Sequence, residues 1–110
     1  MDITVKTAGP VTVVEVVGDI DGKTAPQVQT QVLPLVQPGS RILMDMTQVD
    51  YMSSAGLRML LSTHRTASGT QVRVVLAGLS EEIQDTMSAT GFIGFFTLYD
   101  TVGAALEGLG

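Results

Sequence analysis

The sequence has no cysteine and no tryptophan, and basic residues are scarce. Without cysteine the chain cannot form disulfides, thiolate metal sites or a cysteine nucleophile. Six lysines and arginines stand against eleven aspartates and glutamates, which gives a net charge of −5. Nucleic acids and anionic membranes both require a basic surface, so we expect neither as a partner. The acidity suits a small domain that must stay dissolved, and it would also suit a partner with a basic face.

Other absences narrow the function further. No apolar run reaches the roughly 18 residues of a membrane span, and residues 1–6 lack the features of a signal peptide, so we expect a cytoplasmic protein without membrane insertion. The sequence contains neither a Gly-X-X-X-X-Gly-Lys phosphate loop nor a Gly-X-Ser-X-Gly nucleophile motif. With one histidine and no cysteine, metal ligands are lacking as well. We therefore expect no catalysis, no metal and no cofactor.

The length of 110 residues and the apolar content of 45% predict one globular domain over residues 1–110. β-branched and apolar runs predict strands, and apolar residues at helical spacing predict helices. The expected strands cover 3–5, 11–17, 41–46, 72–77 and, as a short strand or connector, 95–99. The expected helices follow Thr24, Ser53–Ser54, Ser80 and Asp100, each of which is a candidate N-cap. This alternation predicts an α/β fold: a mostly parallel sheet of four to five strands with an antiparallel edge and about four helices.

Several side chains have expected structural roles. Phe92, Phe95 and Phe96 are expected to serve core and inter-helix packing, and His64 is expected to be a buried or half-buried structural residue. His64 lies ten residues after Ser54, or ~15 Å along a helix, which is too far to act as the base of that serine. A serine before the apolar stripe of Leu57 and Leu60 is ordinarily an N-cap.

Three segments, in matching order along the chain, carry a family resemblance. Residues 49–61, read Val-Asp-Tyr-Met-Ser-Ser-Ala-Gly-Leu-Arg-Met-Leu-Leu, follow an apolar strand that ends in the acidic residue Asp45. Residues 18–25, with Asp21 and Thr24, and residues 90–106 supply the other two segments. Together they resemble STAS domains of the anti-sigma factor antagonist type.

The resemblance implies a partner switch. The unphosphorylated antagonist binds an anti-sigma factor that is itself a serine kinase, phosphorylation releases that kinase, and a PP2C-type phosphatase resets the cycle. Alignment on Gly56 and Leu57 places the phosphorylated position at Ser54. Many members have aspartate just before the phosphorylated serine, whereas this chain has Ser53, which leaves Ser53 as the second candidate.

A helix start is a suitable place for a phosphate, because its free N–H groups and positive dipole end favour negative charge. Ser53 could therefore cap the helix while Ser54 accepts the phosphate. Met52 is expected to be exposed before the switch, and Gly56 to leave open space for a partner. Asp19 and Asp21 serve the turn or a contact, and Asp45 either braces the following loop or lies near the phosphorylation site. The expected partner-binding residues are Asp21, Thr24, Met52, Ser53, Ser54, Ala55, Gly56 and Arg58.

A second function remains open. Stand-alone STAS proteins also occur as subunits of ABC lipid-trafficking transporters and as scaffold parts of stress-signalling complexes. In either role the same fold would dock on a helical partner.

Overall fold

The β-branched segments at the start of the chain form an antiparallel hairpin. In the computed structural model, which describes residues 1–110, β1 (Asp2–Ala8) pairs with β2 (Val11–Val17) without interruption. Gly9 and Pro10 make the turn, and Gly9 has a positive φ of 60° that glycine adopts without steric cost. β1 has no second neighbour, so it forms one edge of the sheet.

The remaining strands are parallel to β2 and continue the sheet in chain order. They are β3 (Arg41–Gln48), β4 (Arg73–Ala77) and β5 (Thr97–Tyr99), which gives the order β1-β2-β3-β4-β5. The helices between and after them are α1 (Ala25–Val32), α2 (Ser54–Gly69), α3 (Glu81–Ala89) and α4 (Val102–Leu109). Short 3-10 turns, η1 (Leu33–Leu35) and η2 (Phe92–Phe95), follow α1 and α3. The predicted α/β architecture with an antiparallel edge is confirmed.

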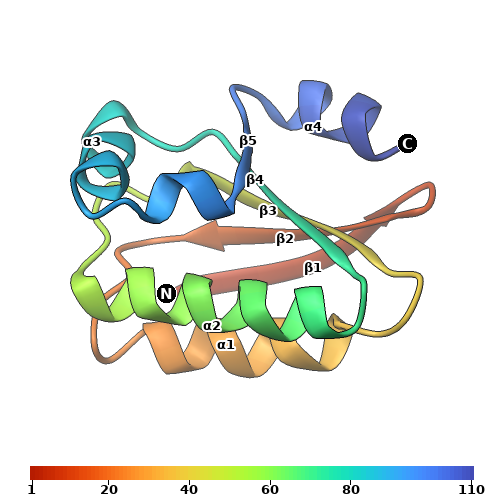
Figure 1. Ribbon diagram of the computed structural model, residues 1–110, viewed down its shortest axis with the longest axis horizontal. Coiled ribbons are helices and arrows are strands. Elements are labelled where there is room, and N and C mark those ends of the chain that lie inside the picture. Colours follow the sequence, from red (N-terminus) through yellow and green to blue (C-terminus); the bar gives the residue numbers. More distant parts are fainter.

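The helices cover the sheet on both faces. Figure 1 shows α1 and α2 side by side below the sheet and α4 on the opposite face. Residues of alternate parity face opposite sides, so Val14 and Met44 belong to the large cluster of 22 buried residues, whereas Val13 and Leu43 belong to a cluster of seven beneath α4. None of the helices combines the length and the apolar composition needed to cross a bilayer.

The structure confirms two of the predicted caps and corrects two. Ser80 accepts a hydrogen bond from the backbone N–H of Ile83 at 3.2 Å, as expected of an N-cap. The prediction for Asp100 is wrong by one residue, because Thr101 caps α4 by accepting from the Ala104 N–H at 3.1 Å. Thr24 precedes α1 but makes no side-chain cap. Its hydroxyl instead donates to the Asp19 carbonyl at 2.7 Å, so it closes the preceding turn.

The aromatic residues near the C-terminal end are not all in the core. Phe92 and Phe96 pack against the large cluster, but Phe95 is 53% exposed, so the prediction of a place in the core is wrong for Phe95. Phe95 closes the 3-10 turn η2, which occupies part of the expected strand over 95–99. His64 is half-buried, as predicted, and its ring lies 6.0 Å from that of Phe95 and 5.4 Å from that of Phe96.

Candidate functional site

The loops after β2 and β3 lie against each other at the carboxyl edge of the parallel strands. The N–H of Gly18 donates to Gln48 O at 3.2 Å, and that of Ile20 donates to Tyr51 O at 2.9 Å. The N–H of Ser53 then returns a bond to Ile20 O at 2.8 Å. These bonds extend the parallel pairing of β2 and β3 beyond the sheet, so the segment that leads into α2 is held in a fixed place.

The two adjacent serines at the start of α2 have different roles. Ser53 is the N-cap, with extended φ and ψ of −78° and 174°, and its Oγ accepts from the Gly56 N–H at 3.4 Å. Ser54 is the first helical residue; its side chain is exposed, and its hydroxyl makes no hydrogen bond within the chain. Ser53 thus serves the fold, while the hydroxyl of Ser54 is available to a partner or to chemistry.

Gly56 lies where the first turn of α2 packs against Ile20 and Met52, so it does not leave an opening. A Cβ at this position would lie 2.5 Å from Cγ of Met52, 2.9 Å from Cγ2 of Ile20 and 3.3 Å from the Ile20 carbonyl oxygen. The first turn of α2 can therefore rest on Ile20 only because residue 56 has no side chain. The expectation that Gly56 leaves space for a partner is wrong, because the loop after β2 already fills that space.

The prediction that Met52 is exposed is wrong: Met52 is buried, and its neighbour Tyr51 is exposed instead. Met52 is 6% exposed and forms a parallel bridge with Ile20, whereas Tyr51 is 54% exposed. Pairing with Ile20 turns Met52 into the core and Tyr51 outward, since successive residues of an extended segment face opposite sides. Tyr51 is an aromatic surface residue beside Ser54 for which the sequence alone gave no exposure.

Asp21 organises the turn beside the start of α2. Its Oδ1 accepts from the backbone N–H groups of Lys23 at 2.9 Å and of Thr24 at 3.1 Å. The Asp21 N–H donates to the hydroxyl oxygen of Thr24 at 2.9 Å, which closes the turn in the other direction. The bond from the Lys23 amide, followed by that from Thr24, holds the pKa of the Asp21 carboxyl below its ordinary value of 3.8, because both favour the charged form. Asp21 and Thr24 thus hold together the turn beside the start of α2.

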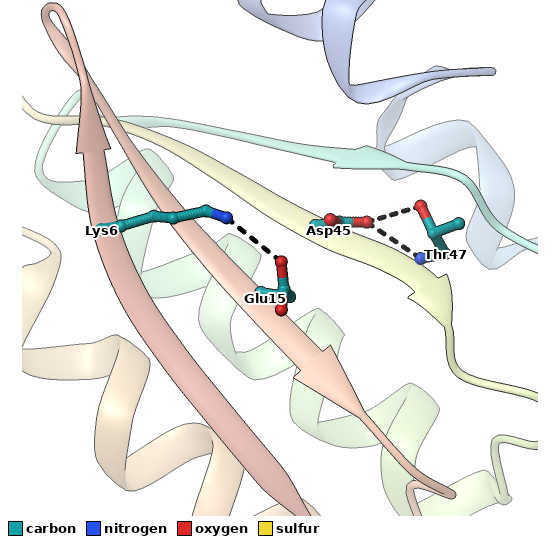
Figure 2. Close-up of polar contacts among 4 residues, drawn as sticks. All are labelled: Lys6, Glu15, Asp45 and Thr47. Carbon is teal, nitrogen blue, oxygen red and sulfur yellow. Dashed lines mark hydrogen bonds and ion pairs between the residues drawn. The ribbon is translucent and has the colours of Figure 1, made fainter.

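Asp45 lies on the other face of the sheet. It is in register with Glu15 and Ala77, and Ala77 belongs to the cluster beneath α4. Its Oδ1 accepts from the Thr47 N–H at 3.0 Å and from the Thr47 hydroxyl at 2.6 Å, as Figure 2 shows. Of the two predicted roles, the structure therefore supports the brace and places this carboxylate on the face that α2 does not cover.

A groove of about 280 Å³ runs between α1 and α2 next to Ser54. Ala55, Arg58 and Ser62 line it from α2, and Ala25 and Gln29 from α1. Gln29 Nε2 donates to Ser62 Oγ at 3.2 Å and so links the two helices. Arg58 is exposed and takes part in no ion pair within the chain. The groove thus combines small apolar residues with one free positive charge, and no group of three or more potential metal ligands is brought together in the structure.

The comparisons with known proteins agree with this geometry. The family model of the STAS domain matches residues 2–105. The anti-sigma-B factor antagonist of Listeria monocytogenes is 30% identical over 89 residues, which make up 80% of this chain and 78% of the relative. An anti-sigma factor antagonist from Mycobacterium paratuberculosis superposes with a TM-score of 0.82 at 29% identity, over 98% of this chain and 92% of that one.

The fold is also that of the anti-sigma factor antagonist SpoIIAA of Bacillus. Its unphosphorylated form superposes with a TM-score of 0.75 at 14% identity, over 97% of this chain and 96% of that one. Its phosphorylated form gives the same TM-score at 15% identity, over 99% and 100%. The chain therefore belongs to the STAS domain family. Within that family it is of the anti-sigma factor antagonist type.

Proposed function

We propose that this protein acts in the cytoplasm as an anti-sigma factor antagonist that is switched by phosphorylation of Ser54. The observation that carries the proposal is the free, exposed hydroxyl of Ser54 on a helix start that Ser53 already caps. Unphosphorylated, the protein binds an anti-sigma factor with serine kinase activity; phosphorylated, it releases that partner, and a PP2C-type phosphatase restores it.

The helix start suits a phosphate. The first turn of α2 contains no acidic residue, so its unpaired N–H groups and positive dipole end are not yet matched by negative charge. A phosphoserine adds about −1.5 to −2 charges and three acceptor oxygens. The domain is therefore expected to keep its fold on modification while the surface at Ser54 gains negative charge.

The exposures around Ser54 support one binding surface for this proposal. Ala55 and Arg58 border the groove between α1 and α2, Asp21 and Thr24 shape the neighbouring turn, and Tyr51 stands beside it. Met52 and Gly56 are buried beneath this surface, where they pack against Ile20 and support it. A partner packed against a neutral hydroxyl would meet a dianion after phosphorylation, and a buried unmatched charge is costly.

The relatives support the proposal at the level of their names. The Listeria and Mycobacterium proteins are anti-sigma factor antagonists, and SpoIIAA exists in an unphosphorylated and a phosphorylated form.

The test begins with each kinase-type anti-sigma factor of the same genome, incubated with ATP and this protein. Mass spectrometry is expected to locate one phosphate on Ser54. Ser54→Ala should remain unmodified, whereas the matched control Ser53→Ala should still be modified. Ser54→Asp should bind the cognate factor at least about tenfold more weakly, or 1.4 kcal/mol. A Ser54 that no candidate modifies, together with normal binding by Ser54→Asp, would refute the proposal. A pull-down that yields a transporter ATPase instead would favour the subunit role.

A further inference from the structure

The two edges of the sheet differ in a way that the partner switch does not use. β5 has three residues, and short strands offer little to pair with. β1 has seven residues, pairs with β2 without a bulge and contains no proline. Its outer side therefore presents an uninterrupted row of backbone groups. Proteins usually shorten, kink or cover such an edge to prevent pairing with another chain.

Apolar side chains of β1 line the side that faces α1. Val5 is opposite Val14, and Ile3 is opposite Val16; both partners belong to the large buried cluster. Val5 is nevertheless 41% exposed. A groove of about 450 Å³ opens at Ile3 between β1 and α1, lined by Met1, Ile3, Pro26, Gln27, Thr30 and Gln31. Apolar surface at this edge is thus left partly uncovered.

The charges of β1 lie on its other side. Asp2, Thr4 and Lys6 alternate with the apolar residues and so share the opposite face. Figure 2 shows Lys6 reaching along that face to Glu15, with Nζ 3.2 Å from Oε2. Lys6 is still 57% exposed and has three donors, while Asp2 takes part in no ion pair within the chain.

We propose that β1 pairs with β1 of a second copy of this chain, antiparallel and centred on Thr4. In this register Thr4 is opposite Thr4 of the second copy. Asp2 is then opposite Lys6 on both sides of the centre, and Ile3 is opposite Val5 on both sides. On one face of the joined sheet, each aspartate is therefore opposite a lysine. On the other face, which carries the groove, apolar residues are opposite apolar residues.

Neighbouring registers lack this match. A shift of the centre to Val5 puts Lys6 opposite Thr4 and Asp2 opposite Ala8. A shift to Ile3 puts Asp2 opposite Thr4 and leaves Lys6 unpaired. Cross-strand pairs of opposite charge and of apolar side chains stabilise a sheet, whereas unmatched ones do not. The charges thus select the register centred on Thr4.

The pairing is expected to be weak and independent of Ser54. Five paired residues and one groove make an interface at the small end of specific ones, so the dissociation constant should lie between about 10 μM and about 1 mM. The N-terminal end of β1 reaches the same edge of the sheet, with Asp2 opposite Val17, but none of residues 2–6 lines the groove beside Ser54 or bonds to the loops that hold it. The proposal therefore holds or fails without regard to the anti-sigma factor.

Sedimentation velocity tests the pairing at concentrations between about 10 μM and about 1 mM, which bracket such a constant. The wild-type chain should shift from monomer to dimer over this range. Asp2→Lys and Lys6→Asp should each weaken self-association at least about tenfold, because each places like charges opposite one another twice. The control Lys23→Asp makes the same charge change as Lys6→Asp, but in the turn before α1, and it should dimerise as the wild type does.

The decisive measurement is a mixture of Asp2→Lys and Lys6→Asp. A mixed pair places lysine opposite aspartate at all four positions, so the mixture should dimerise although neither variant does so alone. Circular dichroism of each variant verifies the fold. A wild-type chain that stays monomeric to about 1 mM, a dimer indifferent to both substitutions, or a mixture that stays monomeric would each overturn the proposal.

Discussion

Helices α2 and α3 both begin behind a capping serine, but their first turns differ in charge. Ser80 is followed by Glu81 and Glu82, whose carboxylates complement the positive end of the α3 dipole. Ser53 is followed by Ser54 and Ala55, and the first turn of α2 contains no acidic residue. The comparison shows one helix start whose electrostatics are complete and one to which a negative charge can still be added.

The two starts also differ in their support. The first turn of α2 rests through Gly56 on Ile20, a residue from a different loop. At α3 the support is local, because the Gln84 side chain donates back to the Leu79 carbonyl at 3.0 Å. α2 is therefore held from outside its own segment, and its exposed surface can change without loss of that support.

The largest expected effect comes from Gly56→Ala. In an ordinary helix this change gains roughly 1 kcal/mol, but here the new Cβ would lie closer than 3.0 Å to both Met52 and Ile20. Overpacking costs about 1–3 kcal/mol and occasionally more, and two such overlaps should reach the upper end, which leaves a net cost of about 2 kcal/mol or more. Urea unfolding should show a net loss of stability. The control is Gly69→Ala at the end of the same helix, where a Cβ meets nothing within 4 Å. If both variants are equally stable, Gly56 is not packed against Ile20 and Met52 as described.

The caps come next. Ser80→Ala and Ser53→Ala should each cost about 0.5–2 kcal/mol of unfolding free energy. The loss should be larger for Ser80, whose bond to the backbone N–H is 3.2 Å against 3.4 Å for Ser53. Thermal unfolding of the two variants gives the order directly. The reverse order would contradict the geometry.

A smaller effect tests the charge difference itself. Ser54→Asp should stabilise the domain by about 0.3–1 kcal/mol at low salt, and Glu81→Gln should destabilise it by a similar amount. The uncharged Ser54→Asn is the control for shape. Both charge effects should shrink as salt rises, because salt screens exposed charges. Destabilisation by Ser54→Asp would show that the start of α2 does not accept negative charge.

The smallest effect is a pH dependence that involves Asp21. Its pKa in the folded chain is below the ordinary value of 3.8, so the charged carboxyl stabilises the fold above that pH, and the contribution is lost as the pH falls through the folded value. Asp21→Asn should therefore differ most in stability from the wild type at neutral pH and less below pH 3.8. A difference that does not change with pH would assign the effect to packing.

The elements of the fold could be predicted because each depends on residues close together in the sequence. The β-branched run at 11–17 and the apolar stripe after Ser54 are local patterns, and both formed as expected. The Asp100 cap failed by one residue because the adjacent Thr101 is also a favoured cap residue, and propensity alone does not fix which of two neighbours begins the helix.

Part of the site could not be predicted, because it depends on a contact between segments 32 residues apart. Ile20 pairs with Met52, and this bridge decides which of Tyr51 and Met52 is buried and why residue 56 must be glycine. Neither the sequence around Ile20 nor that around Met52 indicates by itself that the two residues pair. The Ser53–Ser54 pair was clearer, because capping needs only the neighbouring helix.

The hydrogen bonds that join Gly18 to Gln48 and Ile20 to Tyr51 and Ser53 have a consequence for signalling. They tie the backbone that leads into α2 to the loop after β2, on the side opposite the exposed Ser54 hydroxyl. In the proposed switch, phosphorylation would therefore change the charge at Ser54 and leave the path of the backbone as it is. The response time would then be set by the enzymes that add and remove the phosphate.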